Sequence, residues 1–216
     1  MGGQSVSEIE LGGVAIVGVD LDLTLLDTRA ATAHALEVTN VRCGESIDVD
    51  DLVARLGPPI RDELLRWVAE ERVDDVVRIY RAAFLEEGIA KVTPLPGATG
   101  LRAHVHERGG RLVVITSRIQ QIAEACLLAA GLEADVVVGG LSGRGKAGAM
   151  TANQVDVYIG DHTLDMEGAV VADIPGIGVT TGAHDEAALR QAGAAWVVPS
   201  LVEVSEALRR NARHDG

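Results

Sequence analysis

The sequence predicts an α/β protein with a doubly wound parallel sheet, and two features of the chain predict it. Short runs rich in valine and isoleucine recur along the chain, at residues 14–19, 112–115, 135–138, 155–159, 178–179 and 196–198. Segments with the composition of helices lie between or after the later runs, at residues 119–130, 164–172, 185–192 and 201–213. Apolar strands that alternate with helices are typical of a parallel sheet covered by helices on both faces.

The stretch between residues 27 and 93 interrupts this alternation, because it contains no convincing strand. Helices are expected there at 29–42, 50–56, 61–71 and 74–87, with Asp48 and Asp74 as N-caps and Gly44, Gly57 and Gly88 as helix ends. About 65 residues are too long for a simple crossover between two strands. The sequence therefore predicts two domains, an α/β core formed by residues 1–26 and 94–216 and a helical domain formed by residues 27–93.

Composition excludes several classes of function. Hydrophobic residues make up 47% of the 216-residue chain, which is enough for a core, and the formal charge is −13. An acidic chain with 2% aromatic residues lacks the basic surface and the stacking platforms of nucleic-acid binding, and anionic membranes would repel it. No apolar run approaches the roughly 18 residues of a membrane helix, and residues 1–13 lack a signal-peptide pattern, so we expect a cytoplasmic protein.

Two carboxylates, Asp20 and Asp22, follow the first predicted strand, and Thr24 comes two residues later. Ligands of parallel sheets bind beyond the carboxyl ends of the strands. Two neighbouring carboxylates repel each other and are costly to bury without a partner. A Mg²⁺ ion and a phosphoryl group would account for them, and an ordinary acidic loop is the alternative.

The next strands end in groups that suit the same chemistry. Thr116 and Ser117 follow the second strand, where a hydroxyl could donate to a phosphoryl oxygen or cap the next helix. Lys146 lies in a glycine-rich segment after the third strand, where it could neutralise charge or remain a solvated surface lysine. Only two of the 19 basic residues are lysines, which favours a specific role at this position.

The fourth strand ends at Gly160, and Asp161 and Asp165 follow it. Asp161 is expected at the strand tip and Asp165 about one turn into the next helix. Carboxylates of this kind suit Mg²⁺, which keeps several waters and takes few protein ligands. For Asp165 alone, a favourable charge at a helix N-terminus is the alternative. Four successive strands thus end in groups that one phosphoryl-transfer site would need.

From about residue 14 to residue 204, the sequence resembles the haloacid dehalogenase superfamily. The residues that match its four motifs are Asp20, Asp22 and Thr24, then Thr116, then Lys146, and finally Gly160, Asp161 and Asp165. The helical insert is similar to the C1 cap of this family, and residues 57–64 are similar to the substrate-facing loop of phosphoglycolate-phosphatase-like members. The chain departs from the pattern with Leu23 where glycine is common and His162 where threonine or serine is common.

The resemblance implies a Mg²⁺-dependent phosphatase that hydrolyses a small phosphomonoester metabolite, similar to phosphoglycolate. Asp20 would be the nucleophile that forms an aspartyl-phosphate, and Asp22 would be the general acid and base. Thr116 and Lys146 would stabilise charge on the phosphoryl oxygens. Mg²⁺ would be held by the Asp20 carboxylate, the Asp22 main-chain carbonyl and Asp161, with Asp165 in support.

The insert is expected to select the substrate, because the core groups address only the phosphoryl group. Its Gly57-Pro58-Pro59 segment is stiffened by two prolines. Arg61 follows and could pair with a carboxylate or hydroxyl of the substrate, and a solvated first-turn arginine is the alternative. Ser117 is a second candidate for substrate binding.

Other functions remain open at this point. A phosphomutase of the β-phosphoglucomutase type shares all four motifs, and an inactive binding protein could retain the same fold. Residues 140–146 fit the G-x-x-x-x-G-K pattern of a P-loop nucleotidase, but Ala147 stands where that motif has the Mg²⁺-binding hydroxyl. A haloacid dehalogenase would not need the second carboxylate, Asp22.

Overall fold

The structure, a computed structural model, describes residues 14–212, with the side chains of residues 210–212 left out. The expectations for residues 1–13 and for Arg213, at the end of the last predicted helix, lie outside the described residues. The central sheet has six parallel strands in the order β5-β4-β1-β6-β7-β8. They are β1 (Ile16–Val19), β4 (Arg111–Ile115), β5 (Val136–Val138), β6 (Val157–Gly160), β7 (Gly176–Val179) and β8 (Ala194–Val198). The predicted doubly wound sheet is confirmed.

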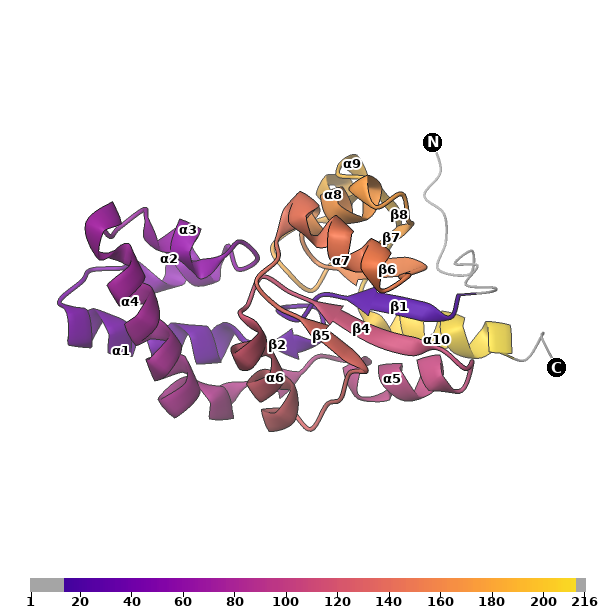
Figure 1. The fold of residues 1–216 in the computed structure, drawn as a ribbon, viewed down its shortest axis with the longest axis horizontal. Coiled ribbons are helices and arrows are strands. Elements are labelled where there is room, and N and C mark those ends of the chain that lie inside the picture. The colour runs from indigo at the N-terminus through magenta and orange to yellow at the C-terminus, as the bar shows by residue number, and fades with distance from the viewer. Residues whose placement is uncertain (1–13, 213–216) are drawn as a thin grey trace.

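Helices cover both faces of this sheet (Figure 1). They are α5 (Ala98–His106), α6 (Gln120–Ala129), α7 (Ala147–Ala152), α8 (Thr163–Val171), α9 (Glu186–Gln191) and α10 (Leu201–Ala212). In Figure 1, α5 and α10 lie on one face, and α7, α8 and α9 lie on the other. Strand β4 is apolar from Leu112 to Ile115 because both of its faces are covered: Leu112 and Val114 join the core on one face, whereas Val113 and Ile115 join the core on the other. None of the described helices is long and apolar enough to cross a membrane.

The helices of residues 29–91 lie beyond one end of the sheet (Figure 1). They are α1 (Arg29–Cys43), α2 (Val49–Val53), α3 (Ile60–Leu64) and α4 (Glu70–Ala83), followed by a π-helical turn (Phe84–Gly88) and a 3-10 turn (Ile89–Lys91). Two short strands, β2 (Leu26–Asp27) and β3 (Thr93–Pro94), pair in antiparallel fashion where the chain leaves and re-enters the core. The sequence did not predict this pair, because two-residue strands carry no periodicity.

The predicted helix at 61–71 is wrong. Helix α3 ends at Leu64 and α4 begins at Glu70, so Asp74 lies inside α4 and does not cap it. In the turn between the two helices, the N–H groups of Arg66 and Trp67 donate to carbonyls three residues back, and Leu64 and Val68 on either side of this turn are both buried. Packing of apolar side chains therefore overrides the local helical propensity here.

The predicted helix ends and caps of this region are partly correct. Gly57 does not end a helix, because α2 stops at Val53. Gly44 does end α1, in the left-handed conformation with φ of 67°. The side chain of Asp48 caps α2 by accepting the N–H of Asp51 at 3.0 Å.

Candidate active site

The site begins at the turn after β1, which carries Asp20 and Asp22. The N–H of Asp20 donates to the carbonyl of Ile159 on the neighbouring strand at 2.9 Å, so the backbone there is fixed by the sheet. Leu23, which stands where glycine is common in the resembling family, has a positive φ of 55°. Its N–H donates to the carbonyl of Leu26 at 2.8 Å and closes the turn that follows the two carboxylates.

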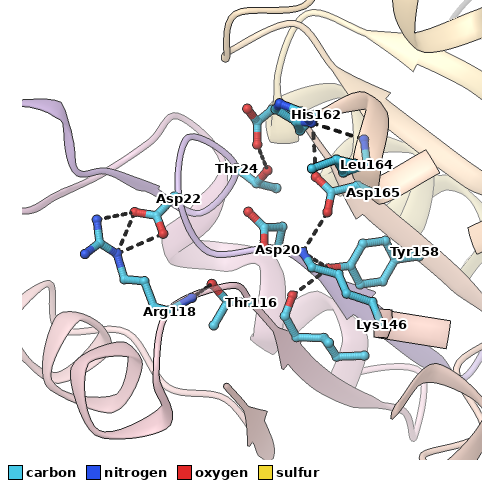
Figure 2. Close-up of polar contacts among 12 residues, drawn as sticks. Asp20, Asp22, Thr24, Thr116, Arg118, Lys146, Tyr158, His162, Leu164 and Asp165 are labelled. Carbon is cyan, nitrogen blue, oxygen red and sulfur yellow. Dashed lines mark hydrogen bonds and ion pairs between the residues drawn. The ribbon is translucent and has the colours of Figure 1, made fainter. Parts of the chain in front are cut away.

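Lys146 lies at the centre of a buried network (Figure 2). Its Nζ donates to Asp20 Oδ1 and to Asp165 Oδ1, each at 2.6 Å, and to the hydroxyl of Tyr158 at 3.0 Å. Burial alone would lower the pKa of Lys146, but Asp165 and Asp20 raise it well above its ordinary value. Lys146 is therefore a buried cation, and the alternative of a solvated surface lysine is wrong.

Three carboxylates form a cluster that suits a divalent cation. Asp20, Asp161 and Asp165 each offer an oxygen, and these oxygens lie within 4.8 Å of one another. Asp161 Oδ1 accepts a hydrogen bond from Thr24 at 2.9 Å, whereas Asp161 Oδ2 is buried without a hydrogen-bond partner among the described residues. A buried acceptor without a donor is unfavourable unless a ligand completes it, and a Mg²⁺ ion satisfies carboxylate oxygens in this way.

Burial and mutual repulsion raise the pKa values of two carboxyl groups in this cluster. The pKa of Asp20 is raised to about 7, mainly by burial; Lys146 lowers it, and repulsion from Asp165 and Asp22 raises it. Burial likewise raises the pKa of Asp161 well above its usual range, together with repulsion from Asp165 and Asp20. Asp165 is held differently, because its Oδ1 accepts from Lys146 and its Oδ2 accepts the N–H of His162 at 3.2 Å.

Asp22 points away from this cluster (Figure 2). Nε of Arg118 lies 2.8 Å from both of its oxygens, Nη2 of Arg118 lies 2.8 Å from Oδ1, and the hydroxyl of Thr28 donates to Oδ1. The structure therefore places the two acids of the first motif in separate surroundings: Asp20 beside a lysine and two further carboxylates, Asp22 beside an arginine.

The hydroxyls after β4 lie at the same edge. Thr116 is fully buried, and its Oγ1 accepts the N–H of Arg118 at 3.2 Å. Ser117 lines a pocket of about 80 Å³ that lies between the core and the helical insert. The core contributes Asp22, Ser117, Arg118, Ile119 and Ile122 to this pocket, and the insert contributes Leu52, Leu56, Gly57, Pro58, Pro59, Ile60, Arg61, Glu63, Tyr80 and Arg81.

Arg61 lines this pocket as expected, but its side chain is already engaged. Its Nε donates to Asp74 at 2.8 Å, and the side chain is 40% exposed. Beside it, Gly57 approaches the core so closely that a Cβ there would lie 2.3 Å from Cδ2 of His162. The loop at Gly57 therefore contacts the core directly.

Sequence reasoning missed three residues of the site: Tyr158, Arg118 and Arg81. Tyr158 looks like an ordinary core residue of β6, and the signal for it was Gly18 on the adjacent strand, where a Cβ would lie 2.7 Å from the Tyr158 ring. Arg118 directly follows Thr116 and Ser117, a position that could have drawn attention. Arg81 gave no signal, because it lies in the last turn of a helix with many charged residues.

Comparisons with known proteins agree with this geometry. A family model for haloacid dehalogenase-like hydrolases matches residues 19–179. The chain is 32% identical over 213 residues to the probable phosphatase IndB of Dickeya dadantii, a match that covers 88% of this chain and 91% of that protein. It is 28% identical to the phosphoglycolate phosphatase of Caulobacter vibrioides, with 89% of this chain and 90% of that protein covered.

The fold is shared with solved structures. A haloacid dehalogenase-like family hydrolase from Streptococcus pneumoniae superposes with a TM-score of 0.76 at 21% identity, over 88% of this chain and 96% of that chain. This protein belongs to the haloacid dehalogenase-like hydrolase family. The resemblance drawn from the four motifs and the expectation of a hydrolase are confirmed, and the P-loop alternative is wrong.

Proposed function

We propose that this protein is a Mg²⁺-dependent phosphatase that hydrolyses a small phosphomonoester through an aspartyl-phosphate on Asp20. One observation carries the proposal: Asp20 lies against Lys146 at 2.6 Å and beside two further carboxylates, while Asp22, two residues away, lies beside Arg118. The two acids have different tasks, because one attacks phosphorus while the other gains and loses a proton, and they have different neighbours here.

The metal would be held by Asp20 and Asp161, with Asp165 beside them. The buried Asp161 Oδ2 has no hydrogen-bond partner among the described residues, so it is an oxygen that a cation could bind. When bound, Mg²⁺ would neutralise negative charge on the phosphoryl oxygens and on the carboxylates. Asp165 would mainly hold Lys146, since both of its oxygens already accept hydrogen bonds.

The first half-reaction follows from the contacts of Asp20. The oxygen of Asp20 that Lys146 does not bind would attack phosphorus, and the bond from phosphorus to the leaving oxygen would break. Asp22 would protonate the leaving oxygen, so that an alcohol departs. Lys146 and Thr116 would stabilise the charge that develops on the phosphoryl oxygens.

The second half-reaction reverses the role of Asp22. Ionised Asp22 would take a proton from a water molecule, whose oxygen attacks the phosphorus of the aspartyl-phosphate. Inorganic phosphate leaves and the Asp20 carboxylate is restored. Arg118 would orient Asp22 in both steps, because its Nε and Nη2 contact that carboxylate.

We propose that residues 27–93 act as a cap over this centre and that the substrate is a small phosphorylated metabolite. The pocket between insert and core, about 80 Å³, suits a leaving group of a few heavy atoms. The similarity to a phosphoglycolate phosphatase supports phosphoglycolate-like esters as the first to test. A closed cap would also exclude bulk water from the reacting groups.

The test is a screen of phosphorylated metabolites in the presence of Mg²⁺, with release of inorganic phosphate as the measurement. We expect at least one small ester to be hydrolysed, chelation to stop turnover and added Mg²⁺ to restore it. Asp20→Asn serves as the inactive control. Full activity in excess chelator after extensive dialysis, or transfer of the phosphoryl group within a sugar phosphate without release, would contradict the proposal.

A further inference from the structure

The pocket between the insert and the core carries positive charge in an otherwise acidic protein. Three arginines line it, Arg61, Arg81 and Arg118, against two carboxylates, Asp22 and Glu63. The chain as a whole has a formal charge of −13. A local excess of cations in such a chain needs an explanation from the site itself.

Most of these charges are already paired. Arg61 pairs with Asp74 at 2.8 Å, and Glu63 pairs with Arg55 at 2.9 Å. Arg81 differs, because its half-buried side chain makes no hydrogen bond or ion pair with any residue that the structure describes. A guanidinium that loses part of its hydration without gaining an acid is unfavourable unless an anionic ligand completes it.

Arg118 presents a second unused donor to the same space. Its Nε and Nη2 contact Asp22, and Nη2 also donates to Thr32 at 3.2 Å. Its Nη1 has no partner within the described chain and points away from Asp22 in Figure 2. The guanidinium lies 4.3 Å from the ring centre of Phe84, which holds its plane and limits its freedom to turn.

We propose that Arg81, together with the free Nη1 edge of Arg118, selects phosphate esters whose leaving group carries a second anionic group. This inference rests on the proposed phosphatase function. The general acid Asp22 must reach the leaving oxygen, and Arg118 touches Asp22, so the rest of the leaving group lies within the pocket that Arg81 lines. A carboxylate or a second phosphate there would supply the anion that Arg81 lacks.

The proposal assigns this selection to Arg81 and not to Arg61. Arg61 already has Asp74 as its acid partner and would have to exchange it for the substrate. Arg81 has no acid partner among the described residues that it would have to release, so the free energy gained when it binds an anion is larger than for Arg61. Arg81 is thus a specificity-determining residue that the sequence motifs do not contain.

The experiment compares esters that differ only in the second charge. One arm uses phosphoglycolate against 2-hydroxyethyl phosphate, which tests a carboxylate. The other arm uses ethylene glycol bisphosphate against the same 2-hydroxyethyl phosphate, which tests a second phosphate on a leaving group of similar size. In each arm the ratio of the two kcat/KM values is measured for the wild type, Arg81→Gln and Arg81→Lys. Arg78→Gln is the matched control, because Arg78 lies on the same helix, is 72% exposed and pairs with Asp75 outside the pocket.

We expect the wild type to prefer the doubly anionic ester in one arm, which identifies the anion. Arg81→Gln should reduce that preference about tenfold or more, Arg81→Lys should retain part of it, and Arg78→Gln should leave it unchanged. Equal loss on both esters of a pair, or no change in Arg81→Gln, would overturn the inference while leaving the phosphatase function intact. If no ester is hydrolysed by the wild type, the proposed function itself fails and the inference fails with it.

Discussion

Lys146 and Tyr158 meet inside the protein, where Nζ of Lys146 donates to the Tyr158 hydroxyl at 3.0 Å. The same hydroxyl donates to the main-chain carbonyl of Ile115, at the end of β4, at 2.6 Å. Burial keeps this hydroxyl protonated, because it raises the pKa of Tyr158 well above its ordinary value. Tyr158 thus ties Lys146 to the strand that carries Thr116, and the two groups expected to face the phosphoryl oxygens are fixed relative to each other.

The first prediction concerns this tie. Tyr158→Phe keeps the ring that fills the space beside Gly18 but removes the hydroxyl. We expect kcat on a small phosphate ester to fall about tenfold, because Lys146 loses one of its three oxygen partners and some of its fixed position. Steady-state kinetics at saturating Mg²⁺ measures this. An unchanged kcat in a folded variant would show that Tyr158 is only a packing residue.

The second prediction concerns Lys146 itself. Lys146→Ala removes the positive charge beside Asp20 and leaves Asp165 without its cation. We expect turnover to fall by about 10²-fold or more, as for other lost electrostatic donors. Circular dichroism would check that the variant remains folded. If turnover stayed within a few-fold of the wild type, the assigned role of Lys146 would be wrong.

The third prediction uses the raised pKa of Asp20. Because its folded-state pKa, about 7, lies above the ordinary value of 3.8, its contribution to stability is fully present below about pH 4 and is lost as the pH rises through 7. In chelator, the wild type should therefore lose about 1 kcal/mol of stability from this group between pH 6 and pH 8, or roughly 2 to 4 °C in Tm.

Asp20→Asn is the test of that prediction, because asparagine does not titrate. Its Tm in chelator should fall less than that of the wild type between pH 6 and pH 8, although turnover with Mg²⁺ is abolished. Thermal unfolding at pH 6, 7 and 8 measures the difference. Parallel curves for the two proteins would mean that Asp20 does not titrate between pH 6 and pH 8, which would contradict a pKa of about 7.

The fourth prediction concerns the contact between the insert and the core. Gly57 has a φ of 149°, and a Cβ there would lie 2.3 Å from His162. Gly57→Ala should therefore displace the loop, raise KM several-fold and destabilise the protein by about 1 to 3 kcal/mol. Substrate kinetics and thermal unfolding measure the two effects.

Gly44→Ala is the matched control for Gly57→Ala. Gly44 also has a positive φ, 67°, but a Cβ there would meet nothing within 4 Å. It should lose a similar amount of stability from the backbone while KM stays unchanged. If both variants raised KM alike, the contact between Gly57 and His162 would have no part in substrate binding.

Much of the site could be predicted because of one property of parallel sheets. Their strands end at the same edge, so groups that follow successive strands, such as Asp20, Lys146 and Asp161, must lie close together. The helical insert was less predictable. Its break between Leu64 and Glu70 and the short strands β2 and β3 depend on which apolar side chains the core accepts, and local propensity does not contain that information.

The sequence by itself determined the sheet, the identity of the groups at its edge and the family to which the chain belongs. Only the tertiary structure decided the partners of those groups: that Arg118 contacts Asp22 across 96 positions of sequence, that Tyr158 lies beneath Lys146, and that Arg61 has an acid partner while Arg81 has none among the described residues. The reason is physical. Strand ends are set by local patterns along the chain, whereas the pairing of charges depends on how distant elements pack and on which charges that packing removes from water.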